Sequence, residues 1–560
     1  MDLFKKLKNW TGWLVFALAS AVYIFTSEPT ASLWDCGEYI ATAYKLQVGH
    51  PPGAPFFQLV GKFFTLFASD TSQVARMVNT MSALSSAFTI LFLFWSITHM
   101  ARKIVTKGEN MVIEGGNLIA IIGSGVVGAL AYTFSDSFWF SAVEGEVYAM
   151  SSFFTAIVFW AMLKWEDAAE DRNGFRWLIL ISYLVGLSIG VHLLNLLTIP
   201  ALIYIYYFKK YKPSTKGIIL SGVISIVLLA FIMYGIIPWI VIFAGNFEML
   251  FVNTFGMPFH SGTIFYFILL VGAIVGGLMY THKKKKLIAN TIILGITFLI
   301  IGYSSFFILV VRSNANTPID ENNPEDATSL LAYLNREQYG DRPLFKGPYF
   351  NAPQKPQNEW GDKSSVYTKS YCVVDLDRLK DPTDIKLGDP GLIKFYQYKN
   401  EANDYLASVN NPAYSIKQAY VLTEVRNNRS PEYDDRFVTI FPRMYSNQRS
   451  AHADVYKTYM GPNPKRIRVN ENGQDKTYEV PTFGDNLHFF FSYQIGHMYM
   501  RYFMWNFAGR QNDIQGHGEK INGNWISGIP FIDNYRLGDQ SLLPVDIQQN
   551  KGTNKYFFLP

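Results

Sequence analysis

The sequence has 560 residues, of which 49% are hydrophobic and 16% are aromatic. Its mean hydropathy is only +0.09, so a strongly apolar part must be balanced by a polar part. A net charge of +5 gives no electrostatic support to nucleic-acid binding. Two cysteines, Cys36 and Cys372, are too few for a disulfide scaffold. These figures predict a membrane protein with a water-facing domain.

Apolar segments before residue 312 predict about nine membrane-spanning helices. The sequence around His192 is interpreted as two helices, because a single helix of that length would overshoot the bilayer. We expect the first segment to be an uncleaved anchor, although its small residues also resemble a signal-peptide cleavage site. The segments are 10–26, 74–100, 118–134, 147–163, 177–191, 193–208, 218–243, 263–280 and 287–311.

Most basic residues before residue 312 fall in alternate gaps between these segments, while the first outer gap holds Lys45 and Lys62, with Arg76 at a helix edge. The positive-inside rule then predicts a cytoplasmic N-terminus, with the 34–55 loop and everything after residue 311 outside. Residues 34–48 and 56–68 are expected to lie along the outer surface as two helices, hinged at a Gly-His-Pro-Pro-Gly turn. The basic clusters are Lys5, Lys6 and Lys8; Arg102, Lys103 and Lys107; Lys164, Arg172 and Arg176; Lys209, Lys210, Lys212 and Lys216; and 283–286.

The pattern changes after residue 311, so we expect a membrane domain at 1–311 and an extracytoplasmic mixed α/β domain at 312–560. A helix is predicted at 324–340, and strands at 371–375 and 437–441. Residues 487–507 are long enough to span a membrane but contain two histidines and an arginine, so an interfacial helix is expected. The aromatic stretch 555–560 resembles the start of a further span and predicts a longer parent protein.

The 34–55 loop carries the strongest chemical signal. Asp35 and Glu38 lie three residues apart, so a helix would place both side chains on one face. A carboxylate there can accept a proton from a hydroxyl that attacks a sugar's anomeric carbon, and His50 can bind a phosphate or a sugar hydroxyl. The alternatives remain open: Ser32, Asp35 and Glu38 also fit capping boxes, and His50 fits a turn histidine fixed by prolines.

Other candidate residues come from later outer segments. Asp136, Glu144 and Glu146 form an acidic loop that would complete a divalent-cation site with Asp35 or Glu38, or would simply be solvated. His192 is a candidate for substrate binding, with a structural histidine as the alternative. Arg312, Arg501 and Arg510 are candidates for holding a lipid phosphate or pyrophosphate, and interfacial snorkelling explains Arg312 and Arg501 equally well.

Four motifs together resemble a known family: WDCGE at 34–38, GHPPGAP at 49–55, EGEVY at 144–148 and RYFMWNFAGRQND at 501–513. An acidic first outer loop after the first span resembles GT-C membrane glycosyltransferases, particularly protein O-mannosyltransferases and the lipid A aminoarabinose transferase. The four motifs are more closely similar to a bacterial protein O-mannosyltransferase-like family formerly listed as a domain of unknown function. The resemblance covers essentially the whole chain.

The resemblance implies a GT-C type bundle, a polyprenyl-phosphate or polyprenyl-pyrophosphate sugar donor, and transfer on the outer face of the bacterial inner membrane. It implies that Asp35 is the base of an inverting reaction on a protein Ser or Thr. Glu38 would assist, although mannosyltransferases have their second acid directly after the first. A glycolipid or cell-surface glycan remains an alternative acceptor. A transporter is a further alternative, but the acids concentrate in outer loops and no internal repeat is visible. A purely structural role, as a component of an assembly, is a fourth alternative.

Overall fold

A computed structural model gives the structure of the chain, and it describes residues 2–107, 113–339, 345–355, 363–427, 431–471, 474–512 and 514–545. Contacts divide the chain into two units. The first comprises Met1–Glu337 and Tyr367–Thr423, and the second comprises Gln338–Val366 and Glu424–Pro560. The predicted domain boundary after residue 311 stays a prediction, while the contacts assign 312–337 and 367–423 to the unit that holds the apolar helices.

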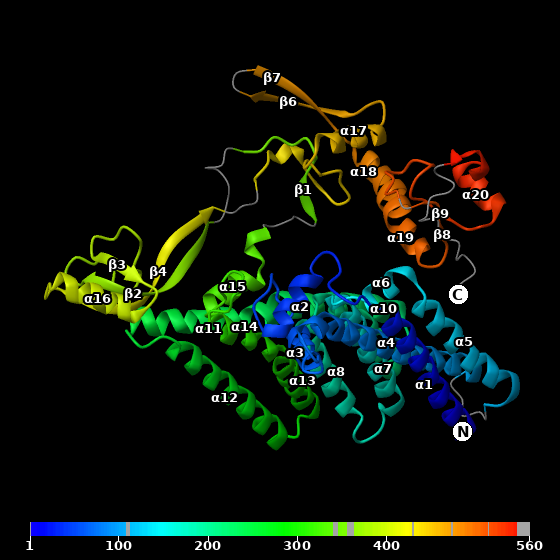
Figure 1. Ribbon diagram of the computed structural model, residues 1–560, viewed down its shortest axis with the longest axis horizontal. Helices are drawn as coiled ribbons and strands as arrows, with labels where there is room; N and C mark the ends of the chain where they lie inside the picture. The colour runs from blue at the N-terminus through cyan, green and yellow to red at the C-terminus, as the bar shows by residue number, and fades with distance from the viewer. Residues whose placement is uncertain are drawn as a thin grey trace. The chain divides into compact units, whose positions relative to one another are not determined.

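Helices dominate the first unit (Figure 1). Every apolar segment predicted from the sequence is helical. The helix is interrupted at 190–192, beside His192, where two separate helices were predicted. The helices are α1 (Asp2–Phe25), α2 (Cys36–Lys45), α3 (Pro55–Thr65), α4 (Val74–Thr106), α5 (Gly115–Thr133), α6 (Asp136–Ala142), α7 (Val147–Ala168), α8 (Phe175–Ile189), α9 (Ile199–Lys210), α10 (Thr215–Ala230), α11 (Ile237–Met249), α12 (Ser261–Lys283), α13 (Leu287–Tyr303), α14 (Phe307–Ser313), α15 (Ala327–Leu334) and α16 (Lys399–Val409).

Six helical segments in the described part of the chain are long and apolar enough to cross a membrane: Thr71–Thr106, Gly115–Thr133, Val147–Ala168, Thr215–Thr254, Ser261–Lys283 and Leu287–Ser313. The predicted class, a polytopic helical membrane protein with a C-terminal region of strands and helices, is confirmed. The other three predicted spans correspond to α1, to α8, and to α9 with the 3-10 turn Leu193–Thr198 before it. The number of nine spans stays a prediction.

The core of the first unit lies beneath the 34–55 loop. Tyr39 of α2 and Phe57 of α3 are buried with their rings 5.4 Å apart, and both belong to a cluster that also takes residues from α4, α7, α8 and α11. Full burial of such a side chain contributes ~1.5–3 kcal/mol. The predicted pair of helices on either side of the Gly-His-Pro-Pro-Gly turn is observed as α2 and α3. Buried side chains of both helices belong to the main core.

A three-stranded sheet belongs to the helical unit, with strand order β3-β2-β4. Its strands are β2 (Lys363–Asp375), β3 (Leu392–Tyr396) and β4 (Tyr414–Asn427). Asn253, just beyond α11, accepts a hydrogen bond from the Tyr420 main-chain N–H and donates to the Tyr420 carbonyl oxygen at 3.0 Å. Buried Glu248 of α11 accepts from the Tyr420 hydroxyl and from three groups at the start of α12. These bonds fix the sheet to the ends of two membrane helices.

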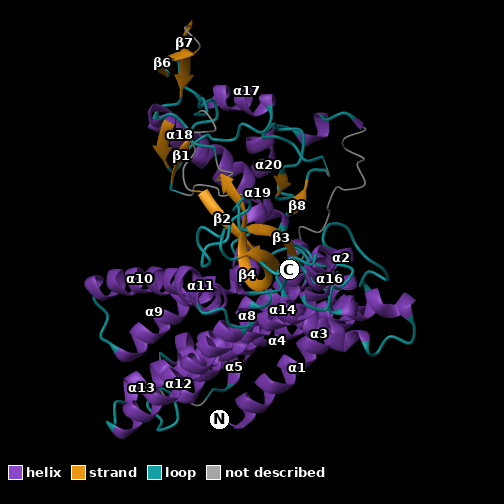
Figure 2. Cartoon of the chain, turned by 90° about the vertical axis from the view of Figure 1, so that its left-hand side faces the viewer, coloured by secondary structure: helices purple, strands orange, loops and turns teal. Residues whose placement is uncertain are grey.

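The second unit is built from short strands and helices, which Figure 2 shows in orange and purple. It contains β1 (Lys346–Pro348), β5 (Val438–Ile440), β6 (Lys465–Glu471), β7 (Gln474–Val480), β8 (Gly509–Arg510), β9 (Trp525–Ile526), α17 (Ser450–Tyr459), α18 (Phe483–Phe489), α19 (Met500–Trp505) and α20 (Pro530–Leu537). The strands predicted at 371–375 and 437–441 are confirmed as β2 and β5. The helix predicted at 324–340 is shorter, because Asp326 caps α15 and the helix ends at Leu334; Gly340 and the stretch 555–560 lie outside the described residues.

Candidate functional site

Asp35 stands at the start of α2 with its carboxylate free of helix capping. Its backbone occupies the N-cap position, yet its side chain accepts no capping hydrogen bond. The capping interpretation of Asp35 is therefore wrong. Its side chain is 56% exposed, and its Oδ2 atom lies 3.9 Å from His50 Nε2. An accessible carboxylate next to a histidine is an arrangement suited to proton transfer.

Glu38 holds His50 at two points. The His50 main-chain N–H donates to Glu38 Oε1 at 2.5 Å, and His50 Nδ1 lies 3.0 Å from Glu38 Oε2. The capping interpretation therefore also fails for Glu38. Burial alone would raise the pKa of Glu38, but the hydrogen bonds and charge of His50 lower it overall. The same hydrogen bond raises the pKa of His50, against the effect of burial. Glu38 thus favours a protonated His50 with Nε2 directed away from Glu38, on the side of Asp35.

The turn that carries His50 is held from several sides. The Tyr333 hydroxyl of α15 donates to the Gly49 carbonyl oxygen at 2.5 Å. Gly53 has a φ of +80° and approaches the same hydroxyl so closely that a Cβ atom would collide with it. A Cβ on Gly49 would stand 2.5 Å from Glu38 Oε1. Both glycines are thus required by close packing against side chains that position His50.

Glu144 and Glu146 converge on the same loop from the second acidic segment. Glu144 accepts a hydrogen bond from Ser32 Oγ at 2.7 Å and is buried. Glu146 caps α7 through the Val147 main-chain N–H and is also buried. Burial, with added repulsion from Asp35 and Glu144, raises the pKa of Glu146 to about 7. Burial and the neighbouring carboxylates raise the pKa of Cys36 to about 12, which leaves its thiol unreactive.

Of the remaining predicted residues, three lie in the first unit and two lie in the second. His192 caps a 3-10 turn by accepting the Leu194 N–H at Nδ1, so its structural role is observed. Arg312 donates from Nε to the Leu46 carbonyl oxygen at 2.5 Å and from Nη2 to the Lys45 carbonyl oxygen, so its guanidinium binds the C-terminal end of α2. Asp136 lies in the first turn of α6. Arg501 and Arg510 lie in the second unit.

No cation site emerges among the described residues, where no group of three or more His, Cys, Asp or Glu side chains is arranged to hold a metal ion. Glu144 and Glu146 are instead occupied by Ser32 and by the start of α7. The predicted divalent-cation site on Asp35, Glu38, Asp136, Glu144 and Glu146 therefore gains no support from the geometry.

Four residues that sequence reasoning missed lie at the site. Tyr333 binds the His50 turn, and the charge of Glu321 acts on both Glu38 and His50. Tyr148 packs against His192 with ring centroids 5.5 Å apart, and exposed Arg336 lies close enough to affect both side chains electrostatically. Tyr148 is the last residue of the EGEVY motif, so the sequence alone could have indicated it as a candidate. Glu321, Tyr333 and Arg336 are about 280 residues from the loop, and no local pattern links them to it.

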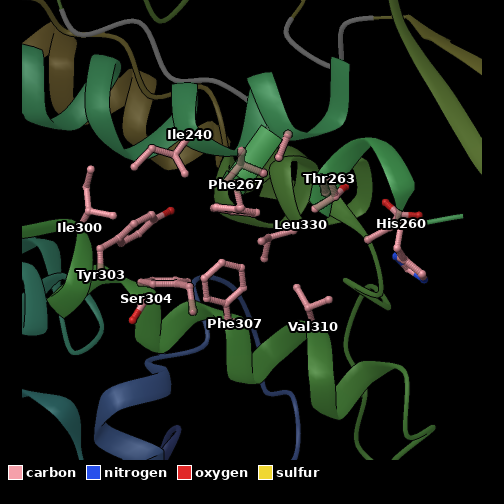
Figure 3. A pocket seen from close by; sticks show the side chains of 15 residues that line it. Ile240, His260, Thr263, Phe267, Ile300, Tyr303, Ser304, Phe307, Val310 and Leu330 are labelled. Atoms are coloured by element: carbon pink, nitrogen blue, oxygen red, sulfur yellow. The ribbon is translucent and has the colours of Figure 1, made fainter. Parts of the chain in front are cut away.

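A separate apolar cavity of about 100 Å³ lies in the same unit, among helices α11 to α15 (Figure 3). Ile240, Phe267, Ile300 and Phe307 line it, and His260, Thr263 and Asp326 supply polar groups. Leu330 of α15 also lines the cavity, three residues before Tyr333. One short helix thus contacts both the cavity and the His50 turn.

A family model matches the part of the chain that holds Asp35, Glu38, His50, Glu144 and Glu146. Residues 35–215, starting at Asp35, match the model of the protein O-mannosyl-transferase TMEM260 N-terminal domain. The resemblance to protein O-mannosyltransferase-like proteins is confirmed. Residues 388–491 match a family of unknown function, DUF8416.

Two curated relatives carry the same name as the matching model. The chain is 24% identical over 246 residues to protein O-mannosyl-transferase tmem260 of Dictyostelium discoideum, which covers 41% of this chain and 27% of that protein. It is 26% identical over 176 residues to protein O-mannosyl-transferase TMEM260 of Mus musculus, covering 31% of this chain and 22% of that protein. The chain therefore spans about a quarter of each relative. No solved structure matches.

Proposed function

We propose that the chain is a membrane glycosyltransferase of the O-mannosyltransferase type, which transfers a sugar from a polyprenyl-phosphate donor to a Ser or Thr hydroxyl of an exported protein. The observation that carries the proposal is the free carboxylate of Asp35 beside His50, at the first residue of the matched family region. The names of the curated relatives support a mannosyl donor and a protein acceptor.

The proposed reaction is a single displacement. The acceptor hydroxyl oxygen forms a bond to the anomeric carbon while the bond from that carbon to the donor phosphate oxygen breaks. Asp35 takes the hydroxyl proton, and the polyprenyl phosphate leaves with the electron pair. Attack from the face opposite the leaving group inverts the anomeric centre. A phosphate is a good leaving group, so a single base is sufficient.

His50 and Glu38 have different roles in this scheme. A protonated His50 places a positive charge beside the site, where a phosphate oxygen gains negative charge as the donor bond breaks. Glu38 acts as a positioning residue, because both of its carboxylate oxygens contact His50. Exposed Arg336 is a second candidate partner for the donor phosphate. The apolar cavity beside α15 has the lining expected for part of a hydrocarbon chain.

The proposed location is the bacterial inner membrane, with a cytoplasmic N-terminus and the Asp35 loop on the outer side. The alternation of basic clusters along the chain supports this orientation. Polyprenyl-linked sugars used outside the cytoplasm would be accessible from that side.

Glycosylation of exported proteins in cells that lack the native protein tests the proposal. Cells carrying Asp35→Asn should show a loss of at least about 100-fold in O-linked sugar on exported proteins, which is the usual scale for removing a general base. The control is Glu28→Gln, which removes an exposed acid from the segment between α1 and α2 and should leave glycosylation unchanged. Normal glycosylation by Asp35→Asn, at an equal amount of protein in the membrane, would remove Asp35 as the base.

A further inference from the structure

The helical stretch 483–505 of the second unit has polar side chains among its buried residues, beside the buried rings of Phe489 and Trp505, and aromatic side chains among its exposed residues. It runs without a break through α18, the π-helical segment Phe490–Tyr499 and α19. Its buried side carries polar groups: Arg501 is only 1% exposed, and buried side-chain atoms of Gln494 and His497 have no hydrogen-bond partner within the described residues.

The opposite side is aromatic and exposed. Phe491 is 61% exposed and Tyr499 is 64% exposed, followed by Tyr502, Phe503 and Phe507. The other exposed side chains of 491–507, a stretch described throughout, are Met, Ser or Gly, and none carries a charge. A soluble surface rarely leaves so long an apolar face uncovered.

Arg501 explains how the polar side is held inward. Its Nη1 atom donates to the Gln515 carbonyl oxygen at 2.6 Å, and its guanidinium lies 5.0 Å from the Trp505 ring. Arg510 stacks on the same ring at 4.3 Å. The two arginines predicted to hold a donor phosphate thus contact one tryptophan, and the Arg501 guanidinium, which is buried, also lies 5.0 Å from the Tyr502 ring.

We propose that the exposed face of residues 491–507 inserts into the outer interfacial layer of the bilayer. Tyr, Phe and Met side chains without charged neighbours match the composition of that layer, where aromatic rings are enriched. In the described part of the same chain, six helical segments are long and apolar enough to cross a membrane. The proposal is independent of the catalytic role of Asp35.

Lipid quenching of a site-attached fluorophore tests the insertion in the full chain. Phe503→Cys and Tyr499→Cys are labelled with an environment-sensitive dye after reconstitution into phosphatidylcholine vesicles with doxyl-labelled acyl chains. Both positions should be quenched several-fold more than Arg468→Cys, an exposed position on the polar hairpin of β6 in the same unit. The native cysteines are both buried, and the unsubstituted protein gives the labelling background.

A second set of variants separates insertion from other coverings of the face. A dye at Phe491→Cys should lose its quenching when Tyr499→Asp and Phe503→Asp are added, and should keep it when Arg468→Asp is added. Quenching at Phe503→Cys no stronger than at Arg468→Cys, in protein with an unchanged limited-proteolysis pattern, would overturn the proposal. A dye that is shielded from water but not quenched by lipid would also overturn it, because a protein would then cover the face.

Discussion

Glu38 and His50 shift each other's pKa in opposite directions. The pKa of His50 is raised above its ordinary 6.5 and that of Glu38 is lowered below its ordinary 4.5. Stability from His50 is present below pH 6.5 and is lost as the pH rises through its raised pKa. Stability from Glu38 is present above pH 4.5 and is lost as the pH falls through its lowered pKa. The charged pair therefore stabilises the loop fully between pH 4.5 and pH 6.5, and this stability is lost below the lowered pKa of Glu38 and above the raised pKa of His50.

Glu38→Gln should lower the pKa of His50, because it removes the negative acceptor at Nδ1. If a protonated His50 assists the reaction, the alkaline limb of the pH–activity profile moves to lower pH in this variant. Glu321→Gln should move it less, since Glu321 is the smallest contributor to the raised pKa of His50. Rates of sugar transfer measured across the pH range check this. An alkaline limb that does not move would exclude His50 as the titrating group.

Glu146 gives a prediction about stability rather than activity. Its native pKa of about 7 means that it holds a proton between pH 4.5 and 7, where the unfolded chain has lost it. The native state therefore loses stability as the pH rises through this range. Glu146→Gln keeps an oxygen that can cap Val147 and removes the charge. It should raise the melting temperature at pH 8, by the equivalent of ~1–3 kcal/mol, and change little at pH 4.

The control for that experiment is Glu28→Gln, which removes the charge of an exposed carboxyl that is not among the groups acting on Glu146. It should not stabilise the protein at pH 8. Equal melting temperatures of the wild type and Glu146→Gln at both pH values would contradict the raised pKa of Glu146.

At the scale of elements, α15 supports the catalytic loop from a distant part of the chain. Tyr333→Phe removes the hydroxyl that binds the Gly49 carbonyl oxygen. Leaving that buried carbonyl unpaired should cost ~1–3 kcal/mol of folding stability. Sugar transfer should fall through a lower kcat with little change in its pH profile, because Tyr333 positions His50 without titrating itself. Tyr339→Phe, at an exposed tyrosine, is the matched control. A wild-type kcat in Tyr333→Phe would show that the turn holds its shape without this bond.

Sequence reasoning predicted elements better than their connections. The apolar runs located the helices, and the Gly-His-Pro-Pro-Gly turn located the hinge between α2 and α3, because both depend on local patterns. The hydrogen bonds between Glu38 and His50 were not predicted. The three-residue spacing from Asp35 suggested that Glu38 assists Asp35 in catalysis, whereas its carboxylate holds His50. The contribution of α15 was out of reach, because long-range contacts such as Tyr333 to Gly49 leave no local signal.

At the scale of the whole molecule, the orientation in the membrane is the property on which the proposed function depends. The alternation of basic clusters predicts that Ser69 lies outside and Lys107 lies in the cytoplasm. A membrane-impermeant maleimide applied to intact spheroplasts should label Ser69→Cys and spare Lys107→Cys, which should react only after the membrane is opened. Both positions are exposed, and the two native cysteines are buried. The reverse labelling would place Asp35 in the cytoplasm and contradict transfer outside.

The attachment of the β3-β2-β4 sheet to α11 and α12 limits how the protein can be divided. The first unit uses the chain up to Glu337 and again from Tyr367 to Thr423, so the second unit is interleaved with it in sequence. A truncation that ends near residue 311 or 337 would remove Tyr420 and leave Glu248 and Asn253, both buried, without the strand that they bind. A minimal fragment for biochemical work should therefore end after Thr423 and replace 338–366 with a short linker.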